Sequence, residues 1–362
     1  MKLKIGPQEI EDIALGAAVL GTGGGGDPYI GKLLAIDAVE KNGDVELIDP
    51  QKVNDHDFFV CIAAMGAPTV IVEKIPSGSE AVLALKELEK YLNKKVSAIV
   101  PIEQGGLNSQ IPIAVAAKLN LPMVDCDGMG RAFPEVQMVT FHLYGISATP
   151  MVVCDERKNS VLIKACDNLW AERLARAVTV QMGGSAFTAS FPMEGFQLKQ
   201  ACIPNSVTLS IKIGKTIREA RSKGFNPIES LVKLLSGKII FRGKIVDVIR
   251  RTQAGFTRGE VKLEGLEEHS GRTLVIDFQN ENLIAKLNGK IIATVPDLIT
   301  ILDTETGTPI TTEGLKYGQR VTVIGIPCNE KWRTKKGLET VGPRYFGYNV
   351  EYVPLEQVGD VN

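Results

Sequence analysis

The sequence predicts an α/β N-terminal domain with a mainly parallel sheet, followed by a mostly β C-terminal domain. Over the first 165 or so residues, segments with helical spacing of apolar residues alternate with short apolar runs, as in a parallel α/β layer. After Gly237, short β-branched runs are separated by Asn-Gly, Glu-Asn and Tyr-Gly turns. We therefore expect an α/β domain at 1–165, a helical segment packed on it at 166–237, and a mostly β domain at 238–362.

In the N-terminal domain, each expected helix shows an apolar stripe and each expected strand a continuous apolar run. The helix Ser79–Leu92 starts at a Ser cap with Glu80 in its first turn. The expected helices are those before Gly21, at 29–39, Ser79–Leu92 and Ile111–Leu119, and the expected strands are 57–64, 97–102 and 122–124.

The middle segment is predicted to contain three helices, and the C-terminal domain seven strands. Pro227 stands in the first turn of the last of these helices, and Gly237 follows its end. The expected helices are 167–181, 205–223 and Pro227–Leu235, and the expected strands are 239–249, 272–278, 283–287, 290–293, 298–302, 320–326 and 345–353.

Composition and charge restrict the class of protein. A chain of 362 residues with 44% hydrophobic residues has enough material for two or three packed domains. The net charge is −1, and although the segment 207–258 is basic, no recognised nucleic-acid-binding motif accompanies it. With neither a signal peptide nor an apolar run of transmembrane length, we expect a cytoplasmic protein that does not bind membranes. We also expect that it does not bind nucleic acid and that it forms a homo-oligomer.

The stretch Gly21 to Pro28 reads Gly-Thr-Gly-Gly-Gly-Gly-Asp-Pro and lies between two expected helices. Glycines accept positive φ and let main-chain N–H groups converge on an anion or a carbonyl oxygen. No strand precedes the loop and the P-loop lysine is missing, so no nucleotide cofactor is expected. A helix-to-helix turn and a substrate-facing nest both remain open. In the second case Thr22, Gly23, Gly24, Gly25, Gly26 and Asp27 are the candidate substrate-binding residues.

Carboxylates and glycines follow two neighbouring strands of the expected sheet. Glu103 follows the strand 97–102, and Asp125 and Asp127 follow the strand 122–124. Ligands of open parallel sheets bind at the carboxyl ends of the strands, where these side chains would meet as an acid/base set or as oxygen ligands of a divalent metal. Alternatively, the two aspartates cap the following turns. Further candidates for binding substrate are Gly105, Gly106, Asn108, Arg131 and Arg344.

In combination, five sequence motifs make this chain resemble the S-methyl-thiohydantoin desulfurase-like family along nearly its whole length. The motifs that carry the resemblance are Gly21 to Pro28, Glu103 to Asn108, Asp125 to Ala132 with Pro134 and Glu135, Met182 to Gly184, and Gly342 to Tyr348. The resemblance implies a bacterial or archaeal enzyme-like protein associated with the breakdown of hydantoins and thiohydantoins. It assigns no role to any single residue.

We therefore expect a hydrolase that opens, or removes sulfur from, a five-membered cyclic imide or thioimide. Such a reaction needs an activated water and an acid for the leaving group, for which Asp125 or Asp127 and Glu103 are the candidates. A metal is not identified, because no His-x-His or His-Glu-x-x-His spacing is present. The alternative is a non-catalytic subunit that binds a small anion in a hydantoin-utilisation system.

Overall fold

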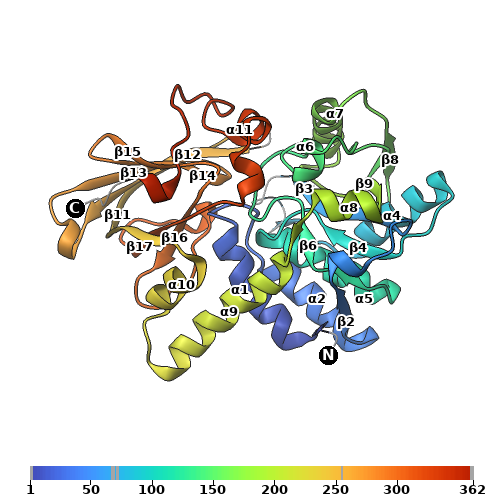
Figure 1. Cartoon of the computed structure of the whole chain (residues 1–362), viewed down its shortest axis with the longest axis horizontal. Coiled ribbons are helices and arrows are strands. Elements are labelled where there is room, and N and C mark those ends of the chain that lie inside the picture. Colours follow the sequence, from blue (N-terminus) through green and yellow to red (C-terminus); the bar gives the residue numbers. More distant parts are fainter. Residues whose placement is uncertain (1–2, 67–69, 71–72, 254–255, 359–362) are drawn as a thin grey trace.

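The computed structural model describes residues 3–66, 70, 73–253 and 256–358. Figure 1 shows an α/β domain on one side and a β domain on the other, with helices α1 (Pro7–Leu20) and α9 (Ser206–Lys223) below and between them. One apolar core runs through both domains, since Val19 and Val100 pack in the same cluster as Leu283 and Ile324. The two domains therefore form one packed unit.

The sheet of the first domain has eight strands in the described part of the chain, in the order β1-β2-β5-β4-β3-β9-β7-β8. Neighbours among β2, β5, β4 and β3 pair in parallel, and the strands on either side add antiparallel pairs. The predicted α/β class is confirmed, with the refinement that the sheet is mixed. The strands are β1 (Leu3–Ile5), β2 (Val45–Ile48), β3 (Phe58–Gly66), β4 (Ala98–Pro101), β5 (Met123–Val124), β7 (Met151–Cys154), β8 (Ser160–Ile163) and β9 (Ser185–Glu194).

The helices agree closely with the sequence-based expectation. Besides α1 and α9 they are α2 (Tyr29–Asn42), α4 (Ser79–Leu92), α5 (Ile111–Leu119), α6 (Thr140–Leu143), α7 (Asn168–Gln181), α8 (Gly195–Ala201), α10 (Pro227–Leu235) and α11 (Lys335–Val341). Helix α1 is held against α9 by a bidentate pair between Asp12 and Arg218, with two bonds of 2.8 Å. This contact lies near the middle of α1, and the glycine-rich loop begins after the last residue of the helix, Leu20. None of the described helices is both long and apolar enough to cross a membrane.

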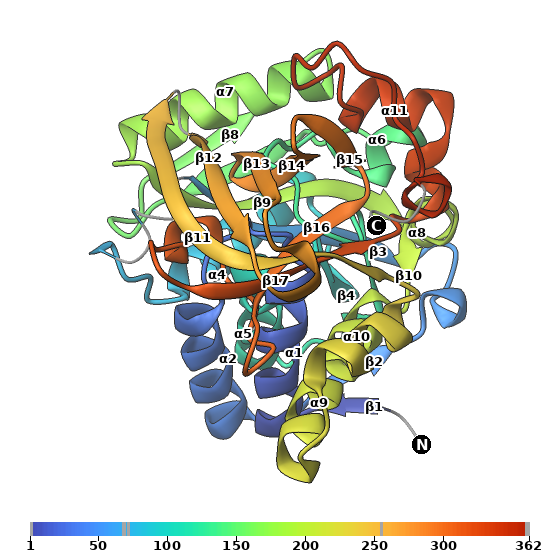
Figure 2. The same cartoon turned by 90° about the vertical axis from the view of Figure 1, so that its left-hand side faces the viewer.

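The second domain is an antiparallel sheet in the order β15-β14-β13-β12-β11-β17-β16, which confirms the mostly β prediction. Figure 2 shows its long strands curving across the face of the molecule. The strands are β11 (Lys238–Gln253), β12 (Phe256–Gly265), β13 (Thr273–Gln279), β14 (Glu281–Leu287), β15 (Lys290–Thr294), β16 (Leu298–Asp303) and β17 (Arg320–Ile326). A two-stranded sheet, β6 (Cys126–Asp127) with β10 (Ile203–Pro204), lies beside α9.

Every helix predicted from the sequence is present, but strands β1, β2, β7, β8, β9 and β12 and helices α6, α8 and α11 were not predicted. The segment 166–237 contains the expected helices but also β9, which pairs with both β3 and β7. The predicted strand 345–353 is wrong, because no strand forms there. Its backbone groups are used in turns instead, in which the N–H groups of Tyr345 and Tyr348 donate to Gly342 O and Pro343 O.

Candidate active site

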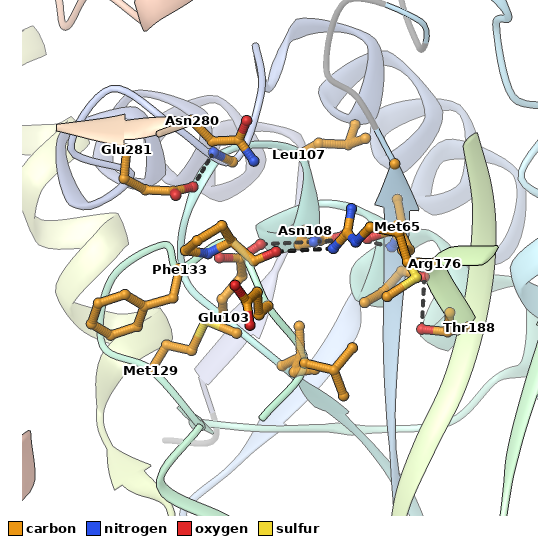
Figure 3. Close-up of a pocket in the computed structure, with 18 residues that line it drawn as sticks. Met65, Glu103, Leu107, Asn108, Met129, Phe133, Arg176, Thr188, Asn280 and Glu281 are labelled. Atoms are coloured by element: carbon orange, nitrogen blue, oxygen red, sulfur yellow. Dashed lines mark hydrogen bonds between the residues drawn. The ribbon is translucent and has the colours of Figure 1, made fainter. Parts of the chain in front are cut away.

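A pocket of about 90 Å³ lies where the carboxyl ends of β3 and β4 meet the tip of the β13–β14 hairpin. Figure 3 shows Glu103, Asn108, Glu281 and Arg176 around it. The crevice at the strand ends is where open parallel sheets bind ligands. The remaining lining residues are Gly25, Ala63, Ala64, Met65, Gly66, Ile102, Leu107, Met129, Phe133, Pro134, Glu135, Val136, Thr188 and Asn280.

Glu103 follows β4 and is almost fully buried in the pocket wall. Its Oε1 accepts a hydrogen bond of 2.7 Å from Nδ2 of Asn108, whereas Oε2 has no hydrogen-bond partner among the described residues. Burial raises the pKa of this carboxyl group well above its usual range, and the nearby charges of Glu281 and Asp127 add to the effect. Burial therefore favours the protonated form of Glu103, although the hydrogen bond from Asn108 acts in the opposite direction, and Oε2 is left for a ligand.

Asn108 fixes the orientation of Glu103. It lies in a 3-10 turn (Gly106–Ser109) and clamps the end of β3, accepting from Ala64 N at 2.6 Å and donating to Ala64 O at 3.2 Å. With both sides of its amide engaged, the side chain cannot rotate without breaking these bonds. The hydrogen bond to Glu103 thus comes from a rigid donor.

The second carboxyl group in the pocket is Glu281, which the sequence analysis treated only as part of a Glu-Asn turn. It is the first residue of β14, after Asn280, whose φ of 59° turns the chain at the hairpin tip. Its Oε1 accepts from Gly25 N at 3.2 Å, and its Oε2 has no partner in the described part of the chain. Burial raises the pKa of Glu281 to about 8, while the charge of Arg131 acts in the opposite direction.

The glycine-rich loop packs against the side chain of Glu281. A Cβ on Gly24 would lie 2.1 Å from Oε1 of Glu281, so a side chain there would collide with the carboxyl group. Gly25 is the loop residue that lines the pocket, and its N–H already donates to Glu281. Gly24 N donates to Gly21 O within the loop. From the sequence, the N–H groups of this loop were expected to bind substrate. In the structure the N–H of Gly25 instead donates to the carboxyl group of Glu281.

Other loop residues join the two domains. Thr22 is fully buried, and its hydroxyl group both donates to Ile299 O and accepts from Ile299 N, each at 2.9 Å. Gly23 O accepts from Thr312 N at 2.7 Å. Gly26 is buried and Asp27 is exposed, with its side chain accepting from Tyr29 N at the start of α2. Thr22, Gly23, Gly26 and Asp27 are absent from the pocket lining.

Gly105 and Gly106 let the two glycine-containing loops pack backbone to backbone. A Cβ on Gly106 would lie 2.3 Å from the carbonyl oxygen of Gly25, and a Cβ on Gly25 would lie 2.8 Å from that of Gly105. Leu107 N also donates to Gly25 O at 2.9 Å. Gly105 and Gly106 do not line the pocket, whereas Gly25, against which they pack, does.

Asp125 and Asp127 lie outside the pocket lining and bind backbone groups. Asp125 accepts from the N–H and the hydroxyl group of Thr208 in the first turn of α9. Asp127 accepts from the N–H groups of Gln104 and Gly130, both at 2.8 Å, and burial raises its pKa to about 7. These contacts agree with the capping alternative considered from the sequence, although Oδ1 of Asp127 has no partner among the described residues.

The two candidate arginines have different surroundings. Arg131 is buried over the ring of Phe133 and donates to the carbonyl groups of Pro296 and Asp297, so it joins the domains. Burial lowers its pKa to about 10, and the charge of Glu281 opposes this shift. Arg344 forms an ion pair of 2.6 Å with Glu351 on the surface. It is not part of the pocket lining.

Polar side chains also mark the rim of the pocket. Glu135 accepts from the hydroxyl group of Tyr345 at 2.8 Å and from Nε2 of Gln137. The motif Gly342 to Tyr348 thus contacts the pocket rim, because Tyr345 donates to Glu135. No three His, Cys, Asp or Glu side chains in the described ranges are grouped as ligands for a metal ion.

Comparisons with known proteins agree with this architecture. The model of the S-Me-THD-like N-terminal domain matches residues 8–165, and that of the S-Me-THD-like C-terminal domain matches residues 166–355. A crystal structure of a protein from Chromobacterium violaceum superposes with a TM-score of 0.82 at 24% identity, covering 98% of this chain and 100% of that one. This similarity shows a shared fold. No curated protein matches the chain.

Proposed function

Because this chain belongs to the S-methyl-thiohydantoin desulfurase-like (S-Me-THD-like) family, we propose that it is a hydrolase of five-membered cyclic imides or thioimides such as hydantoins and thiohydantoins. The observation that carries the proposal is the pair of buried carboxyl groups, Glu103 and Glu281, on one pocket. Each has an oxygen without a partner among the described residues. Two carboxyl groups with different surroundings are a common acid/base pair.

The surroundings of the two groups support different roles for them in the proposed reaction. Glu281 receives an N–H from Gly25 and is influenced by the positive charge of Arg131, both of which favour its ionised form. Once Glu281 is ionised, its negative charge holds the proton on Glu103 more tightly. Glu281 is therefore the base of the pair, and Glu103 is the acid.

The reaction follows from these roles. Glu281 accepts a proton from water as the water oxygen attacks a ring carbon of the substrate. Glu103 donates its proton to the atom that leaves this carbon. If that atom is the ring nitrogen, the ring opens, and if it is an exocyclic sulfur, the ring loses a thiol.

The pocket also suits a small ring. Its volume of about 90 Å³ is well below the roughly 300–1,000 Å³ of sites for drug-sized ligands. Ala63, Met65 and Val136 provide apolar surface for the faces of a ring. The free carboxyl oxygens supply polar contacts for ring N–H and C=O groups.

The test is turnover of hydantoin and of an S-methyl-thiohydantoin by the Glu281→Gln and Glu103→Gln variants, with ring opening and thiol release measured separately. Each variant should lose on the order of 10²–10⁴-fold in kcat, the usual contribution of general acid–base catalysis. Glu264→Gln, an exposed substitution on β12, is the matched control and should retain full activity. Wild-type turnover in both pocket variants would exclude the proposed mechanism.

A further inference from the structure

An arginine on the rim of the same pocket is held in place from three sides. Arg176 lies on the inner side of α7, with 15% of its side chain exposed. Its Nε donates to Glu172, one helical turn earlier, and its Nη2 donates to Pro134 O at 3.0 Å. The guanidinium group also lies 4.5 Å from the centre of the Phe256 ring at the start of β12. These contacts fix the plane of the group.

One edge of this guanidinium group remains open. Among the described residues no hydrogen bond reaches Nη1 of Arg176, and this atom is not among the buried polar atoms that lack a partner. Arg176 lines the pocket together with Glu103 and Glu281, and Figure 3 shows all three around the same space. A fixed, planar donor with a free N–H edge is well suited to a carboxylate.

The charges inside the pocket allow an anion to approach. Burial raises the pKa of both Glu103 and Glu281, which favours their protonated forms and so weakens their repulsion of an incoming carboxylate. The third carboxyl group of the lining, Glu135, is engaged by hydrogen bonds from Tyr345 and Gln137. Arg176 is therefore the charged side chain on this lining that can attract a negatively charged substituent.

We propose that Arg176 is a subsite for an acidic substituent, and that the substrate is a five-membered cyclic imide or thioimide bearing a carboxylate side chain. The ring would lie against Glu103 and Glu281 and the carboxylate against Nη1 of Arg176. This inference rests on the proposed function for the identity of the ring. It adds the substituent, and it assigns Arg176 to specificity and not to proton transfer.

The test compares the binding of hydantoin and of hydantoin-5-acetate to the full-length protein by calorimetry. The wild-type protein should bind the acid at least about 10-fold more tightly, because hydrogen bonds between charged groups are among the stronger ones in proteins. Arg176→Gln should reduce this preference to near unity without weakening the binding of hydantoin. The matched control is Arg173→Gln on the same helix, because Arg173 is exposed and contacts Trp170 instead of the pocket. It should keep the preference.

Further variants separate specificity from folding. Arg176→Gln leaves the buried Glu172 without its partner, so Glu172→Gln/Arg176→Gln is the second variant, in which neither charge remains. Arg176→Lys keeps the charge but loses the planar edge, and should retain only part of the preference. A purely structural role would lower the melting temperature and weaken the binding of both compounds equally.

The outcomes distinguish this inference from the hydrolase proposal. Equal binding of the two compounds by the wild-type protein, no binding of either, or an acid preference that survives Arg176→Gln would overturn the carboxylate subsite. If hydantoin is hydrolysed but no acid preference is found, the hydrolase proposal stands and the subsite fails. If the acid binds through Arg176 and neither ring is hydrolysed, the subsite stands and the hydrolase proposal fails.

Discussion

The backbone N–H of Gly25 donates a hydrogen bond of 3.2 Å to the carboxyl group of Glu281, 256 residues later in the chain. This bond joins the glycine-rich loop of the α/β domain to the hairpin tip of the β domain. It also places Glu281 beside Glu103, so that the candidate acid/base pair exists only when both domains are packed together. The loop therefore contributes to the site by positioning a carboxyl group.

The first prediction concerns Gly24→Ala. Gly24 does not have a positive φ, so the substitution introduces no backbone strain, but the new Cβ would lie 2.1 Å from Oε1 of Glu281. The carboxyl group must then move. Because a displacement of about 1 Å in an active site costs on the order of 10²-fold in rate, kcat should fall by about that factor while the protein remains folded.

This prediction is checked by turnover assays together with thermal unfolding. Gly314→Ala is the control, because its nearest neighbour would lie 3.4 Å away and the pocket lining does not include it. Wild-type turnover in Gly24→Ala would show that the position of Glu281 is not critical.

The fold could be predicted from the sequence because its signals are local. Helical spacing of apolar residues was enough to place Ser79–Leu92 and its neighbours, although the predicted cap at Ser79 is wrong, because the N-cap residue is Gly78. Strand β9 lacked such a signal, since it is buried on both faces and shows no alternation. It also contains Pro192, which argues against a central strand. The structure accommodates this proline at a register shift opposite Phe59 and Cys61.

The candidate site could be predicted only in part, because it depends on contacts between distant segments. The four glycines predicted N–H groups that bind an anion or a carbonyl oxygen, and the N–H of Gly25 donates to a carboxyl group of the protein, that of Glu281. Glu103 follows a predicted strand. Glu281 has no local signal, since a glutamate beside an asparagine at a hairpin tip looks like an ordinary surface turn. Only the packing of the two domains turns that tip into a pocket wall.

The second prediction concerns Asn108→Asp. The substitution removes the Nδ2 donor to Glu103 and Ala64 O and places a second carboxyl group beside Glu103. The loss of this donor to the buried Glu103 should cost about 1–3 kcal/mol of unfolding free energy. Activity should also fall, because Glu103 loses the contact that orients it. Urea unfolding and turnover measure the two effects, and unchanged values in both would refute the assigned role of Asn108.

The third prediction separates Asp125 from catalysis. Asp125→Asn retains a side-chain oxygen that can accept from Thr208 N at the start of α9. Turnover should therefore stay within about two-fold of the wild-type value. Asp125→Ala removes this cap and should cost about 1 kcal/mol of stability, typical of a lost helix cap. A large loss of kcat in Asp125→Asn, with unchanged stability, would show that Asp125 takes part in catalysis.

The fourth prediction is the pH dependence of activity. Glu281 must be ionised to accept a proton, and burial raises its pKa to about 8. The rate should therefore increase with pH through about 8. A pH–rate profile of kcat/KM on hydantoin measures this directly. A profile that is flat between pH 6 and pH 9 would contradict the assignment of Glu281 as the base.

The last prediction is that stability decreases as pH rises, and the sign follows from the same carboxyl group. The pKa of Glu281 is about 8 in the folded protein, against an ordinary value of 4.5 that applies when the chain is unfolded. Between these values the folded state binds more protons than the unfolded state, so the free energy of unfolding falls with rising pH. The stabilisation is fully present below about 4.5 and lost above about 8.

Glu281→Gln should remove the part of this pH dependence that belongs to Glu281. Burial also raises the pKa of Glu103 and Asp127, so the variant should keep a fall of the same sign but smaller by on the order of 1–3 kcal/mol. Urea unfolding of both proteins at several pH values from 5 to 9 measures the difference. Parallel curves would mean that Glu281 titrates near its ordinary pKa, and that burial in the pocket does not hold its proton.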